Sequence, residues 1–104
     1  MLEPGHKAVR LIITGRVQGV WYRGWAVEQA GLLALDGWVR NRADGTVEAL
    51  IVGPESQVDR MITKCRQGPG LAKVSHMDIQ PAMGITPRGF IQKPTVDIDE
   101  RRGL

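Results

Sequence analysis

The run Gly15–Arg23, with the sequence GRVQGVWYR, contains the residue types that bind a phosphate group. It follows an apolar stretch, Val9–Ile13, and precedes a segment with helical periodicity. A strand that passes through a glycine turn into a helix gathers backbone N–H groups and the positive helix end at one point. The guanidinium of Arg23 would add a charged fork for an oxyanion. A second segment, Gly37–Asn41, supplies a carboxamide that could reach the same point. The two segments together predict an enzyme acting on a small phosphate compound.

Each of these residues also has an ordinary structural interpretation. Gly15 and Gly19 are compatible with simple turn glycines, and the run is not a Walker motif because the Gly-Lys-Ser/Thr ending is missing. Arg23 is compatible with a solvated surface charge. Asn41 is compatible with a turn residue that leads into a hairpin. The combination of both segments, with Asn41 placed 18 residues after Arg23, favours the phosphate site.

Length and composition are typical of one compact domain without a membrane span. The chain has 104 residues, of which 42% are hydrophobic and 24% charged. No apolar run approaches the roughly 20 residues that cross a bilayer, and Met1–Lys7 lacks a signal-peptide pattern. We therefore expect a cytoplasmic protein with no membrane partner, and nothing in the sequence requires more than a monomer.

Charge and cysteine usage narrow the possible ligands. Cys65 is the only cysteine, which excludes an intrachain disulfide and a cysteine-built metal site, and its helical context predicts a buried thiol. The net charge of +3 favours anionic ligands. Because the basic residues are scattered along the chain, we expect no nucleic-acid partner.

Periodicity along the chain predicts alternating strands and helices. Apolar residues alternate in the strands and recur at helical spacing in the helices, and Asp44-Gly45 is a strong hairpin turn. The second helix is predicted to have Pro54 at its first position and to stop at Gly68-Pro69-Gly70. The predicted elements are strands at 8–14, 36–42, 46–52 and 74–79, helices at about 22–33 and from 54, and a possible edge strand at 90–92.

The order β-α-β-β-α-β predicts an α+β fold, the ferredoxin-like sandwich with one antiparallel sheet and two helices on one face. A single domain covers residues 1–104, with residues 1–6 as a loose leader and residues 94–104 as a mobile tail. Residues 81–89 are predicted to form a loop.

The chain resembles the acylphosphatase family over about residues 8–92. Gly15–Arg23 resembles the first signature of that family and Gly37–Val47 resembles the second, and the spacing from Arg23 to Asn41 also fits. A weaker resemblance to the family is found at Gly53-Pro54 and in the segment that begins at Gly68. One departure is Ala34, which stands where family members usually carry glycine; if that site needs a positive φ, alanine is strained there by about 1 kcal/mol.

The resemblance implies hydrolysis of the carboxyl–phosphate bond of small acyl phosphates, without a metal or an organic cofactor. Arg23 would hold the phosphate and Asn41 would position the attacking water. The phosphate cradle would be the backbone of six residues, Gln18, Gly19, Val20, Trp21, Tyr22 and Arg23. The side chain of Tyr22 is expected in the core, whereas that of Trp21 could line the mouth of the pocket.

Two other functions are compatible with the same topology. One is a non-catalytic domain that binds anions, because fold alone does not decide function. The other is an RNA-binding module, which needs exposed aromatic residues on the open face of the sheet. The chain has only five aromatic residues, and they do not fall at alternating positions of central strands. Intact Arg23 and Asn41 favour the enzyme over both.

Overall fold

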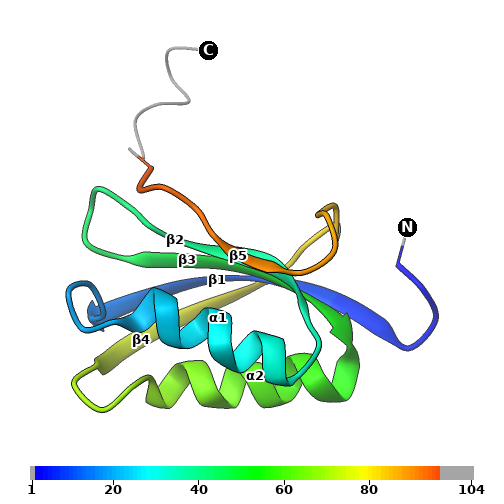
Figure 1. The fold of residues 1–104 in the computed structure, drawn as a ribbon, viewed down its shortest axis with the longest axis horizontal. Helices are drawn as coiled ribbons and strands as arrows, with labels where there is room; N and C mark the ends of the chain where they lie inside the picture. The colour runs from blue at the N-terminus through cyan, green and yellow to red at the C-terminus, as the bar shows by residue number, and fades with distance from the viewer. Residues whose placement is uncertain (1, 97–104) are drawn as a thin grey trace.

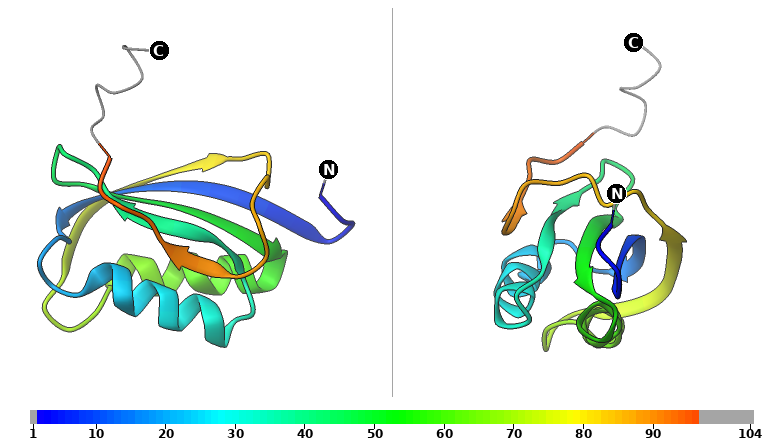
Figure 2. Two further views of the ribbon diagram at one scale, coloured as in Figure 1. Left: turned by 45° about the horizontal axis from the view of Figure 1, so that its top comes forward. Right: turned by 90° about the vertical axis from the view of Figure 1, so that its right-hand side faces the viewer.

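The computed structural model describes residues 2–96, which form one sheet with two helices packed on the same face (Figure 1; Figure 2, right). The elements are β1 (His6–Arg16), α1 (Tyr22–Leu32), β2 (Asp36–Asn41), β3 (Val47–Pro54), α2 (Glu55–Gln67), β4 (Lys73–Pro81) and β5 (Phe90–Gln92). This order confirms the predicted ferredoxin-like α+β fold, and the short strand at 90–92 is present.

The sheet is mixed, whereas the sequence predicted an antiparallel one. Its strand order is β4-β1-β3-β2-β5, and all neighbours run antiparallel except β2 and β5, which pair in parallel. The reason is the path of residues 82–89. After β4, at one edge of the sheet, this segment carries the chain across to the other edge, where it runs in the same direction as β2 (Figure 2).

The main core lies between the sheet and the two helices. Alternate residues of β1 and β3, such as Leu11, Ile13 and Ile51, are fully buried there. The helices contribute the residues predicted for their apolar stripes: Tyr22, Ala26 and Ala30 from α1, and Val58, Met61 and Cys65 from α2. The pKa of the buried Cys65 thiol is raised to about 12, mainly because burial disfavours the thiolate. The burial of Cys65 confirms the prediction of a buried thiol.

Several boundaries differ from those predicted. β1 begins at His6, inside the predicted leader, because its pairing with β3 continues to His6 opposite Pro54. Pro54 is the N-cap of α2 and not its first residue, because its ψ of 139° is extended. β4 includes Pro81, which was assigned to the following loop, because Pro81 is still paired with Val9.

Ala34 has a φ of 54°, which confirms the condition under which strain was expected at this position. It follows the C-cap of α1, where the chain turns back toward β2. Alanine in this left-handed conformation costs about 1 kcal/mol because its Cβ approaches the backbone.

The outer face of the sheet, which neither helix covers, carries a paired cluster of charges. The carboxylate of Glu48 is almost fully buried and accepts hydrogen bonds from Arg10 Nε at 2.6 Å and from Arg40 Nε at 2.8 Å. Trp38 lies beside this cluster, with Arg40 and Lys93 over its ring at 4.6 and 4.7 Å. Trp38 is the only aromatic side chain that residues 2–96 place on this face.

The described part of the chain ends against the β2–β3 hairpin. Val96 N–H donates to the carbonyl of Asn41, and the carbonyl of Val96 accepts from Ala43 N–H. The tail predicted from Pro94 is therefore described only as far as Val96, and residues 97–104 lie outside the described range. Within residues 2–96, no helix is both long enough and apolar enough to span a bilayer.

Candidate active site

The loop between β1 and α1 combines buried anchors with free backbone donors. Val17 and Val20 are buried in the core and fix the two sides of the loop. Within residues 2–96, the backbone N–H groups from Gln18 to Arg23 have no hydrogen-bond acceptor. Some of them belong to the first turn of α1, where no intrahelical acceptor exists. The loop therefore presents a group of donors and the positive end of a helix, which together attract an anion.

Gln18 ties this loop to the β2–β3 hairpin through its side chain. Its Nε2 donates to the carbonyl of Arg42 and to that of Thr46, both at 2.9 Å. Asp44 closes the same turn by accepting from the backbone N–H and the hydroxyl of Thr46, and these hydrogen bonds lower the pKa of the Asp44 carboxyl. The loop and the hairpin are therefore held in a fixed relation at one end of the molecule (Figure 1).

A pocket of about 130 Å³ lies between these two segments. Its lining residues are Val17, Gln18, Gly19, Trp21, Tyr22, Arg23, Gly24, Asn41 and Gln92. Arg23, from the first turn of α1, and Asn41, from the last position of β2, are thus brought to one pocket from separate parts of the chain. Of the predicted cradle residues, only Val20 is absent from the lining, because its side chain is buried in the core.

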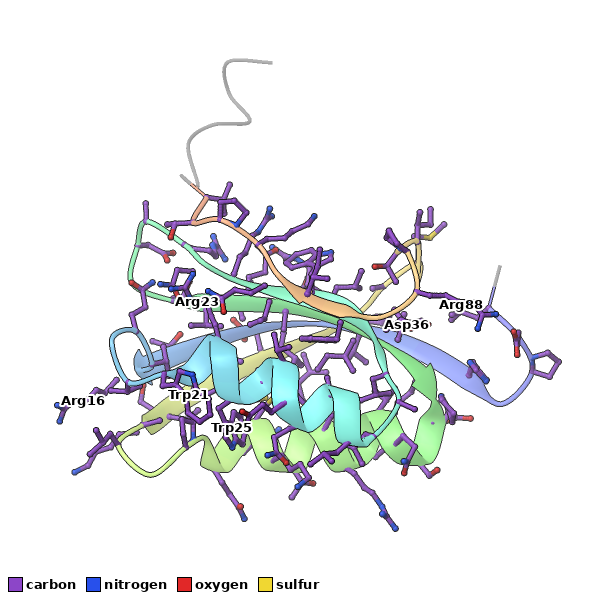
Figure 3. The ribbon with its side chains drawn as sticks, in the orientation of Figure 1. Arg16, Trp21, Arg23, Trp25, Asp36 and Arg88 are labelled. Atoms are coloured by element: carbon purple, nitrogen blue, oxygen red, sulfur yellow. The ribbon has the colours of Figure 1, made fainter. Side chains whose placement is uncertain are left out.

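Arg23 is half-buried and lines the pocket, and its guanidinium has no carboxylate partner among residues 2–96. Its charge is therefore available to an anion. Arg16, at the end of β1, projects outward from the molecule, away from Arg23 (Figure 3). The two arginines of the first signature thus have different environments, and only Arg23 lines the pocket.

Asn41 carries an unpaired acceptor. Its Oδ1 is buried, and it has no hydrogen-bond partner among the described residues. A buried acceptor left unpaired costs about 1–3 kcal/mol relative to one that is hydrogen-bonded. Asn41 lines the pocket, and an unpaired buried acceptor in such a residue is suited to a hydrogen bond from a water or a ligand.

Tyr22 fixes the start of α1 to the second helix. Its hydroxyl donates to the carbonyl of Cys65 at 2.6 Å, and burial is the main cause that raises its pKa above the ordinary value. The phenol is therefore neutral and structural, as its place on the apolar stripe predicted. This anchor holds the adjacent Arg23 at the pocket.

Trp21, the N-cap of α1, has the left-handed backbone conformation, with a φ of 64°. For a bulky residue this conformation costs about 1–2 kcal/mol. Gly24, another residue of the pocket lining, lies inside the helix, where glycine costs about 1 kcal/mol relative to alanine. A Cβ on Gly24 would collide with the indole nitrogen of Trp21. The sequence had suggested that Trp21 lines the pocket mouth, but not that its backbone is strained.

Gln92 is a pocket residue that sequence reasoning missed. It is the last residue of β5 and pairs with Val39 of β2, on the side of the sheet that Asn41 faces. The signal available in the sequence was one polar residue at the end of an apolar triplet, which does not indicate the parallel partner. Among residues 2–96, no three His, Cys, Asp or Glu side chains are grouped so that they could hold a metal ion.

The sequence and the fold have counterparts among known proteins. The family model described as Acylphosphatase matches residues 9–91. An acylphosphatase from Rhizorhabdus wittichii is 52% identical over 94 residues, covering 90% of this chain and 95% of the relative. One from Rhodospirillum rubrum is 53% identical over 90 residues, covering 86% and 99%.

Solved structures agree with the sequence relatives. The structure of an acylphosphatase from Coxiella burnetii matches with a TM-score of 0.84 and 26% identity, covering 89% of this chain and 98% of the other. The crystal structure of acylphosphatase from Bacillus subtilis matches with a TM-score of 0.78 and 32% identity, covering 83% and 97%. The chain therefore belongs to the acylphosphatase family. It is a hydrolase of acid anhydrides, and its family and fold support acyl phosphate hydrolysis.

Proposed function

We propose that Arg23 binds the phosphate of a small acyl phosphate, that Asn41 orients the attacking water, and that no metal takes part. The backbone N–H groups from Gln18 to Arg23 complete the phosphate site. The reaction breaks the bond between phosphorus and the carboxylate oxygen. It releases a carboxylate and inorganic phosphate.

The observation that supports this proposal most is the composition of the pocket. The residues that line one space of about 130 Å³ carry a guanidinium, a row of backbone N–H donors and an amide whose buried oxygen is unpaired, none of them with a partner among residues 2–96. The first two attract an oxyanion, and the third accepts a hydrogen bond from a water molecule.

The chemistry of acyl phosphates requires little more than these groups. The leaving group is a carboxylate, whose conjugate acid has a pKa of about 4. It departs without being protonated, so a general acid is unnecessary. Phosphoryl transfer passes through a loose transition state in which charge is spread over the equatorial oxygens. Positioning and charge stabilisation therefore dominate, and a fixed guanidinium with aligned N–H donors supplies both.

Asn41 suits the water-binding role because a carboxylate at that position would repel the substrate anion. The unpaired Oδ1 accepts a hydrogen bond from the water, whose oxygen attacks phosphorus. Neither histidine of the chain lines the pocket. We therefore propose that a phosphate oxygen of the substrate takes the water proton. The pH–rate profile should then show no protein base that titrates near neutrality.

An assay of phosphate release from benzoyl phosphate in the presence of EDTA tests the proposal. Wild type should turn over at an unchanged rate when EDTA is added. Asn41→Ala should lower kcat more than substrate affinity, because water placement matters mainly in the transition state. Arg23→Lys should both lower kcat and raise KM, because lysine cannot make the forked contact.

Three results would contradict parts of the proposal separately. Wild-type activity in Asn41→Ala removes the water-orienting role. Loss of activity with EDTA, restored by a divalent cation, removes metal independence. Binding of inorganic phosphate by calorimetry without any turnover identifies a non-catalytic anion-binding domain. A cytoplasmic location and a monomeric state remain predictions from the sequence, and sedimentation of the purified protein tests the second.

A further inference from the structure

Among residues 2–96, Trp21 differs from the other two tryptophans because it packs on neither the core nor a charged side chain. Its side chain is 59% exposed, although it lines the pocket that Arg23 and Asn41 share. Trp25 packs against Tyr22 with ring centroids 5.3 Å apart. Trp38 is covered by two cations. Figure 3 shows Trp21 and Arg23 at the same end of α1. The exposed indole therefore has no stabilising role in the described core.

Two unfavourable features of the backbone accompany this position of the indole. Trp21 has the left-handed conformation that bulky residues avoid, and Gly24 lies in the first turn of a helix, where glycine is unfavourable. Both serve the same placement, because a side chain at Gly24 would displace the indole. Strain of this kind persists at sites where a side chain must be held for a ligand.

The position of the indole relative to the phosphate groups indicates what it contacts. The charged and donor groups of the pocket face an oxyanion, so the rest of a bound acyl phosphate must extend away from them. Trp21 and Gly24 lie at the pocket and provide an apolar surface next to those groups. Aromatic rings pack favourably on an indole, whereas a methyl group gains much less from it.

We propose that Trp21 is a specificity-determining residue that binds the acyl group and makes the enzyme favour aromatic acyl phosphates over acetyl phosphate. This inference rests on the proposed function, because it takes the phosphate to be bound at Arg23. The indole contacts the organic part of the substrate and leaves the phosphate chemistry to the groups already described.

The test compares kcat/KM for benzoyl phosphate and for acetyl phosphate in wild type, Trp21→Gly, Trp21→Ala and Trp21→Phe. The benzoyl-to-acetyl ratio should fall about tenfold in the glycine and alanine variants and should be largely kept by phenylalanine. Taking the ratio cancels the different reactivities of the two substrates. Trp21→Gly also relieves the backbone strain, so a folding defect would not explain its effect. Trp25→Phe, in the same helix but outside the pocket, is the matched control and should keep the wild-type ratio.

Calorimetric binding of phenylphosphonate and methylphosphonate separates this inference from the proposed function. Wild type should bind the phenyl compound more tightly, and Trp21→Gly should lose that preference. If wild type hydrolyses neither acyl phosphate, the proposed function fails. The binding preference for the phenyl compound still tests whether the indole contacts the organic group. A benzoyl-to-acetyl ratio that stays constant, or an equal loss for both substrates, would overturn the role of Trp21 in binding the acyl group.

Discussion

The pocket formed by the Gln18–Arg23 loop and the end of β2 differs from the outer face of the sheet in how its polar groups are paired. On the outer face, the buried carboxylate of Glu48 is bonded by two arginines, and Trp38 is covered by cations. At the pocket, Arg23 has no carboxylate partner within the described range, and Asn41 Oδ1 is buried without a hydrogen bond. The same short sheet contributes residues to both regions.

This difference distinguishes residues that stabilise the fold from residues kept for a ligand. A buried polar group costs free energy unless it is paired, so a folded chain normally satisfies such groups internally. Unpaired donors and acceptors that converge on one space are expected where a ligand completes them. Substitutions on the outer face should therefore lower the free energy of unfolding, whereas those at the pocket should lower the rate of hydrolysis.

Replacing Arg23 should give the largest effect. Arg23→Ala should lower kcat/KM for benzoyl phosphate by at least about 10²–10³, the loss seen when one donor to a developing charge is removed. The free energy of unfolding should change by no more than about 0.5 kcal/mol, because no described ion pair is broken. Steady-state kinetics and urea unfolding measure the two quantities.

Arg16→Ala is the control and should stay within about twofold of wild type in kcat/KM, because Arg16 points away from the pocket. Equal losses in both variants would mean that the general positive potential matters and not the position of Arg23.

Replacing Glu48 should lower the stability of the fold and leave the activity unchanged. Glu48→Gln weakens two charge-assisted hydrogen bonds and should lower the free energy of unfolding by about 2 kcal/mol, with kcat/KM close to wild type. Urea unfolding at neutral pH measures the loss. A drop in activity without a loss of stability would show that the outer face acts on the pocket.

The same carboxylate predicts how stability depends on pH. Burial alone would raise the pKa of Glu48, but hydrogen bonds and charges from Arg40 and Arg10 outweigh it and hold the pKa below its ordinary value of 4.5. The stabilisation is therefore complete above pH 4.5 and is lost as the pH falls through the lower, folded-state pKa. Between neutral pH and this acidic range, the gap in unfolding free energy between wild type and Glu48→Gln should narrow. A difference in unfolding free energy that stays constant over this pH range would contradict the assignment of the pH dependence to Glu48.

Ala34 provides the smallest and most specific test, because it repeats the strain of Trp21 at the end of α1 that does not line the pocket. Ala34→Gly should raise the free energy of unfolding by up to about 0.5 kcal/mol, since relief of the left-handed conformation exceeds the entropy that glycine adds to the unfolded chain. Activity should not change. Thermal unfolding followed by circular dichroism would detect the shift, and a lower melting temperature would contradict it.

Local patterns in the sequence predicted the element types well, for a physical reason. Burial on one side of a strand or helix imposes a period on the sequence, so the elements around Leu11, Tyr22 and Met61 could be recognised from apolar spacing alone. The hairpin was indicated by Asp44-Gly45, because its turn has strong residue preferences. The positions of Arg23 and Asn41 at one pocket followed from a strand–turn–helix motif and from family resemblance.

Features that depend on distant partners could not be predicted in this way. The two hydrogen bonds from Gln18 reach residues 24 and 28 positions away, and the parallel pairing of β5 joins Gln92 to Val39. No local period encodes such contacts. The left-handed conformation of Trp21 was also missed, because residue preferences argue against it. The missed contacts of Gln18 and Gln92 and the missed conformation of Trp21 belong to the pocket, where a site can override local preferences. The boundary differences at His6, Pro54 and Pro81 lie outside it.

The hydrogen bonds between Val96 and the hairpin have a practical consequence for handling this protein. Val96 is bonded to the backbone of Asn41, which lines the pocket, so the chain passes Val96 beside that pocket. Leu2 packs with Ala8, Leu50 and Val52 on the uncovered side of the sheet, at the far end of the molecule (Figure 1). An affinity label or fluorophore intended to leave turnover undisturbed is better placed at the amino terminus.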